Sequence, residues 1–266
     1  MTTALERNNV QVRGSAEGRP MLFAHGFGCD QNMWRSVWPA FAADHRVILM
    51  DYVGHGRSDH RAFDPERYAS LDGYAADILE VVHELDLREA VLVGHSVSAM
   101  IGALAVAREP ERFSRLVMVG PSPRYIDDGD YVGGFSRADV DELLTSLEGN
   151  YLGWSSAMAP AIMGNDDRPE LGEELTELFC ATDPEIARHF ARVTFLSDNR
   201  ADLPRVPVRT LVLQCSSDII APEGVGAYVH RHLPDSELVQ LVATGHCPNL
   251  SAPEETAEAI RAFLDS

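Results

Sequence analysis

The chain contains no lysine: all 22 of its basic residues are arginine. Enzymes that form a Schiff base with a substrate or with pyridoxal phosphate need a lysine amine. The phosphate-binding loop of nucleotide hydrolases needs a lysine that reaches the phosphates. The composition therefore excludes both classes of protein.

Cysteine is also scarce. The four cysteines, Cys29, Cys180, Cys215 and Cys247, show no CxxC spacing of the kind that marks zinc sites. Disulfide frameworks are typical of short, cysteine-rich secreted chains. We therefore expect reduced thiols, no metal site and no cofactor.

Long apolar segments are absent as well. No run is long enough to cross a membrane, and residues 1–15 lack the apolar centre of a signal peptide. These features predict a cytoplasmic protein. Positive charge is outweighed by 41 acidic residues, which leaves a net charge of −19. Such a surface repels phosphates, so we expect neither a nucleic-acid partner nor binding to anionic membranes.

What the chain does have is enough apolar material for a core: 45% of its 266 residues are hydrophobic. Strand patterns occur at residues 9–13, 21–24, 46–50, 91–93, 116–119, 211–213 and 238–242. Helical patterns lie between them at 32–43, 71–85, 97–108, 224–233 and 254–264. This alternation predicts an α/β fold with a mostly parallel sheet covered by helices on both faces. Residues 9–13 are expected as an antiparallel edge strand, and residues 21–24 as the first inner strand.

One interval breaks the alternation. Residues 137–147, 151–163, 169–179 and 184–196 show helical patterns with no convincing strand among them. We predict a four-helix cap (residues 121–203) inserted into a core made of residues 1–120 and 204–266. The large apolar residues of this cap can pack against one another or face the site below, and some of each are expected. The predicted site is a deep apolar pocket with Ser96 at its floor.

The stretch 90–103, AVLVGHSVSAMIGA, is typical of a nucleophile elbow. In this motif a buried strand turns sharply into a helix and presents a serine, here Ser96, at the end of the strand. Gly94 and Ser98 flank it closely and must be small; the usual motif has glycine at the position of Ser98. The alternative interpretation is a serine that only caps the helix.

Two further residues follow predicted strands in the order expected of a catalytic triad. Asp218 comes after the strand pattern that ends at Cys215, and His246 after the one that ends at Val242. In this chemistry a histidine takes the proton of the serine, and an aspartate holds the histidine in the right tautomer. Singly, Asp218 could cap a turn and His246 could be an ordinary loop residue. The order Ser96, Asp218, His246 favours the triad.

An early loop completes the predicted site. Residues 25–28, HGFG, follow the strand pattern at 21–24. Backbone N–H groups in such a loop stabilise the negative oxygen that forms during ester hydrolysis. We predict that Phe27 and Val97 supply these donors. A plain glycine turn is the alternative.

Specific segments carry a resemblance over almost the whole chain. They are AHGFGCDQ at 24–31, YASLDGY at 68–74, GHSVSAMIG at 94–102, SPRY at 122–125, YVGGF at 131–135, SDNR at 197–200 and GHCP at 245–248. In them the sequence resembles the small α/β hydrolases that include the bacterial stress-response regulator RsbQ and the plant karrikin and strigolactone receptors. The resemblance implies the α/β-hydrolase fold and the triad and oxyanion hole named above. It also implies a pocket lined by Phe27, Tyr125, Phe135, Leu143, Trp154 and Phe195.

Three functions are compatible with these features. The first is a serine hydrolase that acts on a small apolar ester, lactone or butenolide-type compound and serves as a ligand sensor in a bacterial signalling pathway. For that function the resemblance implies a phosphatase-type regulator protein as partner. The second is a metabolic carboxylesterase or lactonase without a signalling role. The third, a binding protein with a vestigial triad, is disfavoured because no triad member is missing. Dehalogenases and epoxide hydrolases are disfavoured because they have an aspartate at the position of Ser96. The first function is our expectation.

Overall fold

A seven-stranded sheet forms the centre of the computed structural model, which describes residues 2–266. Its order is β1-β3-β2-β4-β5-β6-β7. The strands are β1 (Gln11–Gly14), β2 (Arg19–Ala24), β3 (His45–Leu49), β4 (Ala90–His95), β5 (Phe113–Val119), β6 (Arg209–Ser217) and β7 (Ser236–Thr244). Only β1, at one edge, pairs antiparallel; the neighbours from β3 to β7 are parallel. The predicted α/β fold is confirmed, with β3 lying between the edge strand and β2.

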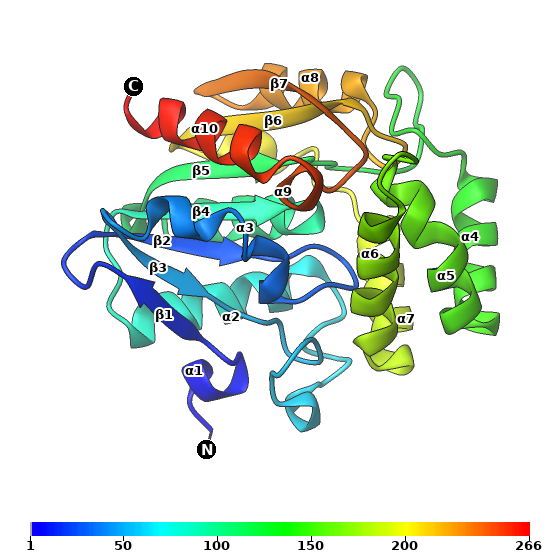
Figure 1. Ribbon diagram of the computed structural model, residues 1–266, viewed down its shortest axis with the longest axis horizontal. Coiled ribbons are helices and arrows are strands. Elements are labelled where there is room, and N and C mark those ends of the chain that lie inside the picture. The colour runs from blue at the N-terminus through cyan, green and yellow to red at the C-terminus, as the bar shows by residue number, and fades with distance from the viewer. Residues whose placement is uncertain (1) are drawn as a thin grey trace.

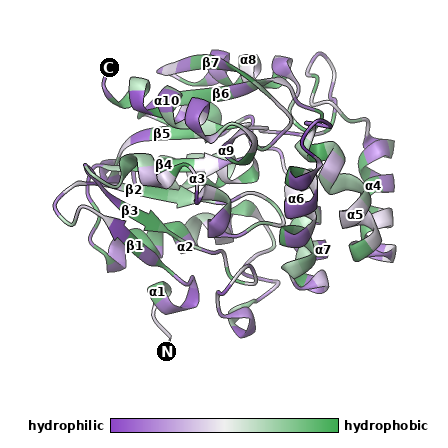
Figure 2. Ribbon diagram, viewed as in Figure 1, coloured by the Kyte–Doolittle hydropathy of each residue, from purple (hydrophilic) through white to green (hydrophobic). Residues whose placement is uncertain are grey.

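Alternation along the strands divides the interior into two cores, because successive side chains of a strand point to opposite faces. On β2, Met21 and Phe23 belong to the core that contains α10 (Pro253–Leu264). Leu22 and Ala24 belong to the core that contains α2 (Leu71–Glu84), α3 (Val97–Arg108) and part of α8 (Glu223–His232). Helices therefore cover both faces of the sheet (Figure 1). The hydropathy colouring is green along the central strands and turns purple on the outer helices (Figure 2).

Four further helices lie together beyond the sheet. They are α4 (Arg137–Gly149), α5 (Tyr151–Met163), α6 (Pro169–Ala181) and α7 (Pro184–Phe195). They occupy the side toward which the parallel strands point (Figure 1). The four helices predicted in this interval are present with nearly the predicted bounds. Two isolated bridges, one of them between Ile126 and Phe135, are the β pairing that the described part of the interval contains.

The helix predicted at residues 32–43 is wrong. Two short 3₁₀ turns replace it, η1 (Gln31–Trp34) and η2 (Trp38–Phe41). Pro39 lacks the N–H that a continuous helix would use at this position, and it lies instead at the start of the turn η2. The apolar residues still reach the core: Met33, Trp34, Val37 and Phe41 are fully buried.

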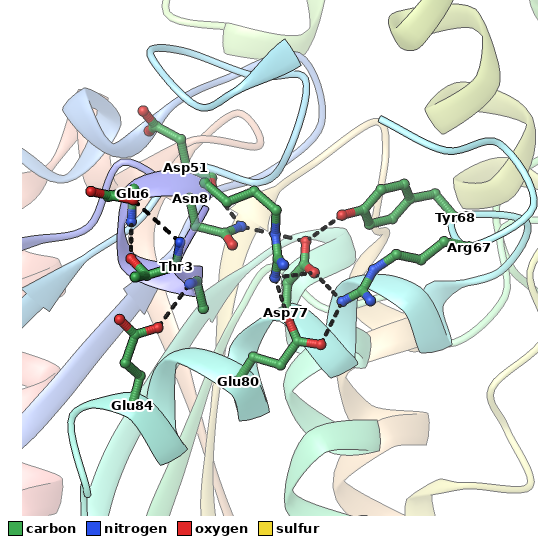
Figure 3. Close-up of polar contacts among 11 residues, drawn as sticks. Thr3, Glu6, Asn8, Asp51, Arg67, Tyr68, Asp77, Glu80 and Glu84 are labelled. Atoms are coloured by element: carbon green, nitrogen blue, oxygen red, sulfur yellow. Dashed lines mark hydrogen bonds and ion pairs between the residues drawn. The ribbon is translucent and has the colours of Figure 1, made fainter. Parts of the chain in front are cut away.

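A buried carboxylate joins the N-terminal segment to the body of the fold (Figure 3). Asp77 of α2 has no exposed surface and accepts hydrogen bonds from Tyr68 (2.8 Å), Arg67 (2.6 Å) and Arg7 (3.2 Å). Arg7 belongs to the short helix α1 (Ala4–Arg7). The backbone N–H of Ala4 also donates to Glu84 at 2.8 Å. Because a buried charge is costly without partners, this cluster holds α1 against α2.

The structure also describes the cysteines and the length of the apolar helices. All four cysteines are free. No helix within residues 2–266 is long and apolar enough to cross a membrane.

Candidate active site

Ser96 lies between β4 and α3 in a strained backbone conformation, with φ 56° and ψ −123°. Residues other than glycine rarely adopt such a conformation, and it persists only where surrounding structure enforces it. Its N–H donates to the carbonyl of Val119 at 2.8 Å, which ties the turn to β5. A Cβ at Gly94 would lie 2.3 Å from the carbonyl oxygen of Ser98, so glycine is required there. The strand, tight turn and helix are those of the predicted elbow.

The structure brings Ser96, His246 and Asp218 into one hydrogen-bonded chain. His246 Nε2 lies 2.7 Å from Ser96 Oγ, and His246 Nδ1 lies 2.7 Å from Asp218 Oδ2. All three residues are buried. Asp218 follows directly on β6, and His246 follows β7 after one glycine. The three side chains therefore meet at the carboxyl edge of the sheet, although 150 residues separate the serine from the histidine.

The environment of Asp218 favours its charged form. Burial alone would raise the pKa of this carboxyl, but the adjacent His246 ring and two backbone N–H groups outweigh it, so the pKa is lowered. Those donors are the N–H groups of Ile220 (2.8 Å) and Ala221 (3.0 Å), both bound to Oδ1. Oδ2 is left to accept from Nδ1 of His246, which leaves Nε2 free to accept from Ser96.

The loop that carries His246 is attached to helix α5. The N–H of His246 donates to the carbonyl of Ile162 at 2.9 Å. Next to it, a Cβ at Gly245 would lie 1.7 Å from the carbonyl oxygen of Met163, and Gly245 has φ +81°. Asn165, just beyond α5, donates to the carbonyl of Thr244 at 3.0 Å. The position of the histidine therefore depends on the position of α5.

A second histidine, His95, also holds the loop that carries His246. His95 Nε2 lies 2.8 Å from the carbonyl oxygen of His246. Burial lowers the pKa of His95 to about 3, and the nearby His246 ring adds to this effect. The ring is therefore neutral and donates its Nε2–H to that carbonyl.

The predicted oxyanion donors, Phe27 and Val97, both have free N–H groups: neither donates a backbone hydrogen bond in the part of the chain that the structure describes. Phe27 follows His25 and Gly26, and the carbonyl of His25 accepts a short hydrogen bond from the Ser98 hydroxyl. Because that hydroxyl is the donor there, it accepts from Tyr52, whose hydroxyl lies 2.8 Å away. The serine that departs from the usual elbow motif thus connects the start of α3 to the loop of Phe27.

Beside Ser96 lies a small, mainly apolar cavity. It is lined by Phe27, Cys29, His95, Ser96, Tyr125, Trp154, Ile162, Leu175, Phe179, Thr194, Phe195, Ile220, His246 and Cys247. Its free space is about 30 Å³, roughly what one or two water molecules require. An ester can enter only if some of the lining side chains move.

Four of the six predicted pocket residues line this cavity: Phe27, Tyr125, Trp154 and Phe195. Phe135 and Leu143 are not among its lining residues, and for them a place in the pocket stays a prediction. Both are partly buried against the apolar core instead. Leu143 lies on α4, whose buried residues Val140, Leu144 and Leu147 face α5 and α7 rather than the cavity.

Sequence reasoning missed several lining residues, among them Thr194 and Phe179. Their helices were predicted, but the rotation of each helix about its axis was not.

Burial also raises the pKa of Tyr125, with a smaller opposing effect of the Ser96 side chain. The Tyr125 phenol is therefore neutral beside the serine.

Within residues 2–266 no group of three or more His, Cys, Asp or Glu side chains is arranged to hold a metal ion.

Comparison with known proteins identifies the family. The chain matches the model of the alpha/beta hydrolase family over residues 21–259. It is 39% identical to the strigolactone esterase D14 of Arabidopsis thaliana, across 98% of this chain and 97% of that protein. It is 38% identical to the karrikin insensitive 2 receptor CA of Petunia hybrida, across 94% and 92%. A solved hydrolase from Oleispira antarctica has a TM-score of 0.96 at 40% identity and covers 99% of this chain and 96% of its own.

The chain therefore belongs to the α/β hydrolase family. It is a serine ester hydrolase, and the predicted likeness to plant karrikin and strigolactone receptors is confirmed.

Proposed function

We propose that Ser96 is the nucleophile of this hydrolase, His246 its general base and acid, and Asp218 the residue that orients His246. The hydrogen-bonded chain Ser96–His246–Asp218, with 2.7 Å at both links, carries this proposal. As Ser96 Oγ attacks an ester carbonyl, its proton moves to His246 Nε2, and the imidazolium is stabilised by Asp218. The same proton then passes to the leaving alkoxide, and a water molecule attacks the acyl-enzyme by the reverse route.

The N–H groups of Phe27 and Val97 are the donors that we assign to the developing oxyanion. Their lack of backbone acceptors supports this assignment, as does their proximity to Ser96: Val97 follows it in the chain, and Phe27 lines the same cavity. Donors that are fixed before the reaction stabilise the transition state without reorganisation. Ser98 and Tyr52 contribute by holding the loop that precedes Phe27.

The substrate that we propose is a small apolar ester, lactone or butenolide-type compound. The aromatic lining of the cavity supports apolar character, and its size supports a small ligand. Residues 121–203 would act as the cap over this site, and they supply Tyr125, Trp154, Ile162, Leu175, Phe179, Thr194 and Phe195 to the lining.

A sensor role is the second part of the proposal. Relatives with 38% and 39% identity are named as a karrikin receptor and a strigolactone esterase. The cavity must open to admit a ligand, and the backbone of His246 is bonded to α5, so occupancy would be coupled to the arrangement of the cap. A partner that prefers one arrangement would bind more tightly when ligand is present. A phosphatase-type regulator is the partner implied by the resemblance; a metabolic esterase or lactonase without any partner is the alternative.

Steady-state kinetics on a small aryl ester test the catalytic assignment. Ser96→Ala should lower kcat by about 10⁴-fold or more, because triad residues act as a unit. Ser122→Ala is the matched control, since Ser122 is also buried and its hydroxyl donates to the carbonyl of Arg124 (3.0 Å). Turnover by folded Ser96→Ala at the rate of the control would refute the assignment.

A further inference from the structure

Among the threonines in the helices that the structure describes, one behaves differently from the others. Serine and threonine side chains inside helices commonly donate to the carbonyl four residues earlier. Five hydroxyls do so here, those of Thr145, Ser155, Ser156, Thr176 and Thr256. Thr194, in the last turn of α7, does not: its Oγ1 has no hydrogen-bond partner within residues 2–266. The residue is only 1% exposed, so water at the protein surface does not satisfy it either.

Thr194 lines the cavity beside Ser96. A buried hydroxyl without a partner destabilises the folded protein, so such groups are rare unless something binds them. Of the other hydroxyl and imidazole groups around the cavity, Ser96 and His246 bond to each other and Tyr125 lies beside Ser96. His95 bonds through Nε2 to the carbonyl of His246, and its Nδ1 is an acceptor without a partner within residues 2–266. The Thr194 hydroxyl is therefore a donor in the cavity wall that has no acceptor within residues 2–266.

We propose that Thr194 is a second polar anchor for the substrate, donating a hydrogen bond to an oxygen other than the scissile carbonyl. The substrate class is then narrower than an apolar ester: it is an ester or lactone that carries one additional acceptor, an ether or carbonyl oxygen. This inference rests on the proposed function of Ser96. A site that is built to bond a polar group discriminates strongly against analogues that lack it, because the buried group is otherwise left unpaired.

The first test uses the protein without ligand. Thr194→Val keeps the shape of the side chain and removes the unsatisfied hydroxyl, so the variant should unfold at the same or a higher urea concentration than wild type. Thr256→Val is the matched control: Thr256 is fully buried in α10, and its hydroxyl donates to the carbonyl of Ala252 at 2.9 Å. The control should unfold at lower urea. If Thr194→Val is destabilised as much as Thr256→Val, the hydroxyl already has a partner and the proposal is wrong.

The second test measures specificity with pairs of p-nitrophenyl esters. One member of each pair has an alkyl acyl chain, and the other has a chain of equal length with one ether oxygen at its third, fourth or fifth carbon position. For at least one pair, the ether-to-alkyl ratio of kcat/KM should fall about 2- to 10-fold in Thr194→Val relative to wild type, the range expected for one neutral hydrogen bond. Intrinsic reactivity cancels in this comparison. Thr256→Val should keep the wild-type ratios.

The outcomes separate this inference from the catalytic assignment. If Thr194→Val hydrolyses the alkyl esters normally and every ratio equals that of wild type, the anchor is refuted while Ser96 stands. If Ser96→Ala retains full turnover, the catalytic assignment fails first. A lower ether-to-alkyl ratio in Thr194→Val, with intact turnover of the alkyl esters, supports the anchor.

Discussion

At the scale of single residues, the site depends on a few side chains that fix backbone groups. Ser98 is the clearest of them. Its hydroxyl connects the loop that begins at His25 with Tyr52, which lies beyond the end of β3. The His25 ring adds two more contacts: Nε2 accepts from the N–H of Tyr52 (3.1 Å), and Nδ1 donates to the carbonyl of Gly26 (2.9 Å). Burial lowers the pKa of His25, so the ring is neutral, as this pattern of one donor and one acceptor requires.

Tyr52→Phe tests this arrangement. The change removes the donor to Ser98 and frees the loop that precedes Phe27, so kcat should fall by about 2- to 10-fold while KM changes little. Tyr74→Phe is the matched control. Tyr74 is equally buried, its ring packs 5.5 Å from that of Tyr52, and its hydroxyl has no partner among the described residues. Kinetics on one aryl ester would decide: equal effects of the two variants would contradict a role for the Tyr52 hydroxyl in catalysis.

At the scale of elements, α5 has two roles. Through the carbonyl of Ile162 it holds the backbone of His246, and through Trp154 it forms part of the cavity wall. Trp154 stacks on Phe179 of α6 (5.9 Å, 9°) and meets Phe27 edge-on (6.1 Å). Helix α5 and the loop of Phe27 are therefore in direct aromatic contact at the cavity.

Trp154→Ala should change substrate preference. Removing the indole enlarges the cavity, so kcat/KM for a branched acyl ester should rise relative to that for an acetyl ester, while the rate for acetyl ester falls only modestly. Leu143→Ala is the control, because Leu143 lies on α4 outside the lining. A ratio that shifts equally in both variants would show that the indole is only structural.

The arrangement of helices and strands also explains which features of the site could be predicted from the sequence. Ser96, Asp218 and His246 could be located because each follows a strand, and strand order brings strand ends together. The contact of Ser98 with His25 and Tyr52 could not, because it joins three distant segments through one hydroxyl. The surroundings of Leu143 could not be predicted either, because the periodicity of α4 gives an apolar face but not what that face contacts. Residues 32–43 show a helical apolar pattern but form two 3₁₀ turns, and Pro39 lacks the N–H that a continuous helix would use there. The division into core and cap stays a prediction.

At the scale of the whole molecule, buried histidines should govern the stability at mildly acidic pH. Burial lowers the pKa of His25, His55 and His95, for His95 to about 3. In the unfolded chain each titrates near 6.5, so below that pH the unfolded state binds protons that the folded state does not. The free energy of unfolding therefore falls as the pH drops, by up to about 1.4 kcal/mol per pH unit for each histidine. Burial raises the pKa of Asp77, so this carboxyl binds its proton more readily in the folded protein. At lower pH this one group therefore opposes the loss of stability.

Urea unfolding at about pH 7 and about pH 5 measures this loss. His55→Phe should reduce the loss of unfolding free energy with falling pH by an amount that corresponds to about one bound proton. Phenylalanine should be tolerated there, because neither ring nitrogen of His55 has a partner in the described chain and its ring already packs on Phe190 (5.1 Å). An unchanged slope in this variant, or no loss of stability in wild type, would contradict the account of the buried histidines.

The central claim is that Ser96 is the nucleophile, and covalent labelling tests it most directly. Attack of Ser96 Oγ on an aryl phosphonate ester would form an O–P bond and release the aryl oxide, and the product would resemble the tetrahedral intermediate that we propose Phe27 and Val97 to stabilise. Intact-protein mass spectrometry should show a single adduct on wild type, peptide mapping should locate it on Ser96, and Ser96→Ala should remain unlabelled. An adduct on another residue, or an undiminished adduct on folded Ser96→Ala, would contradict the claim.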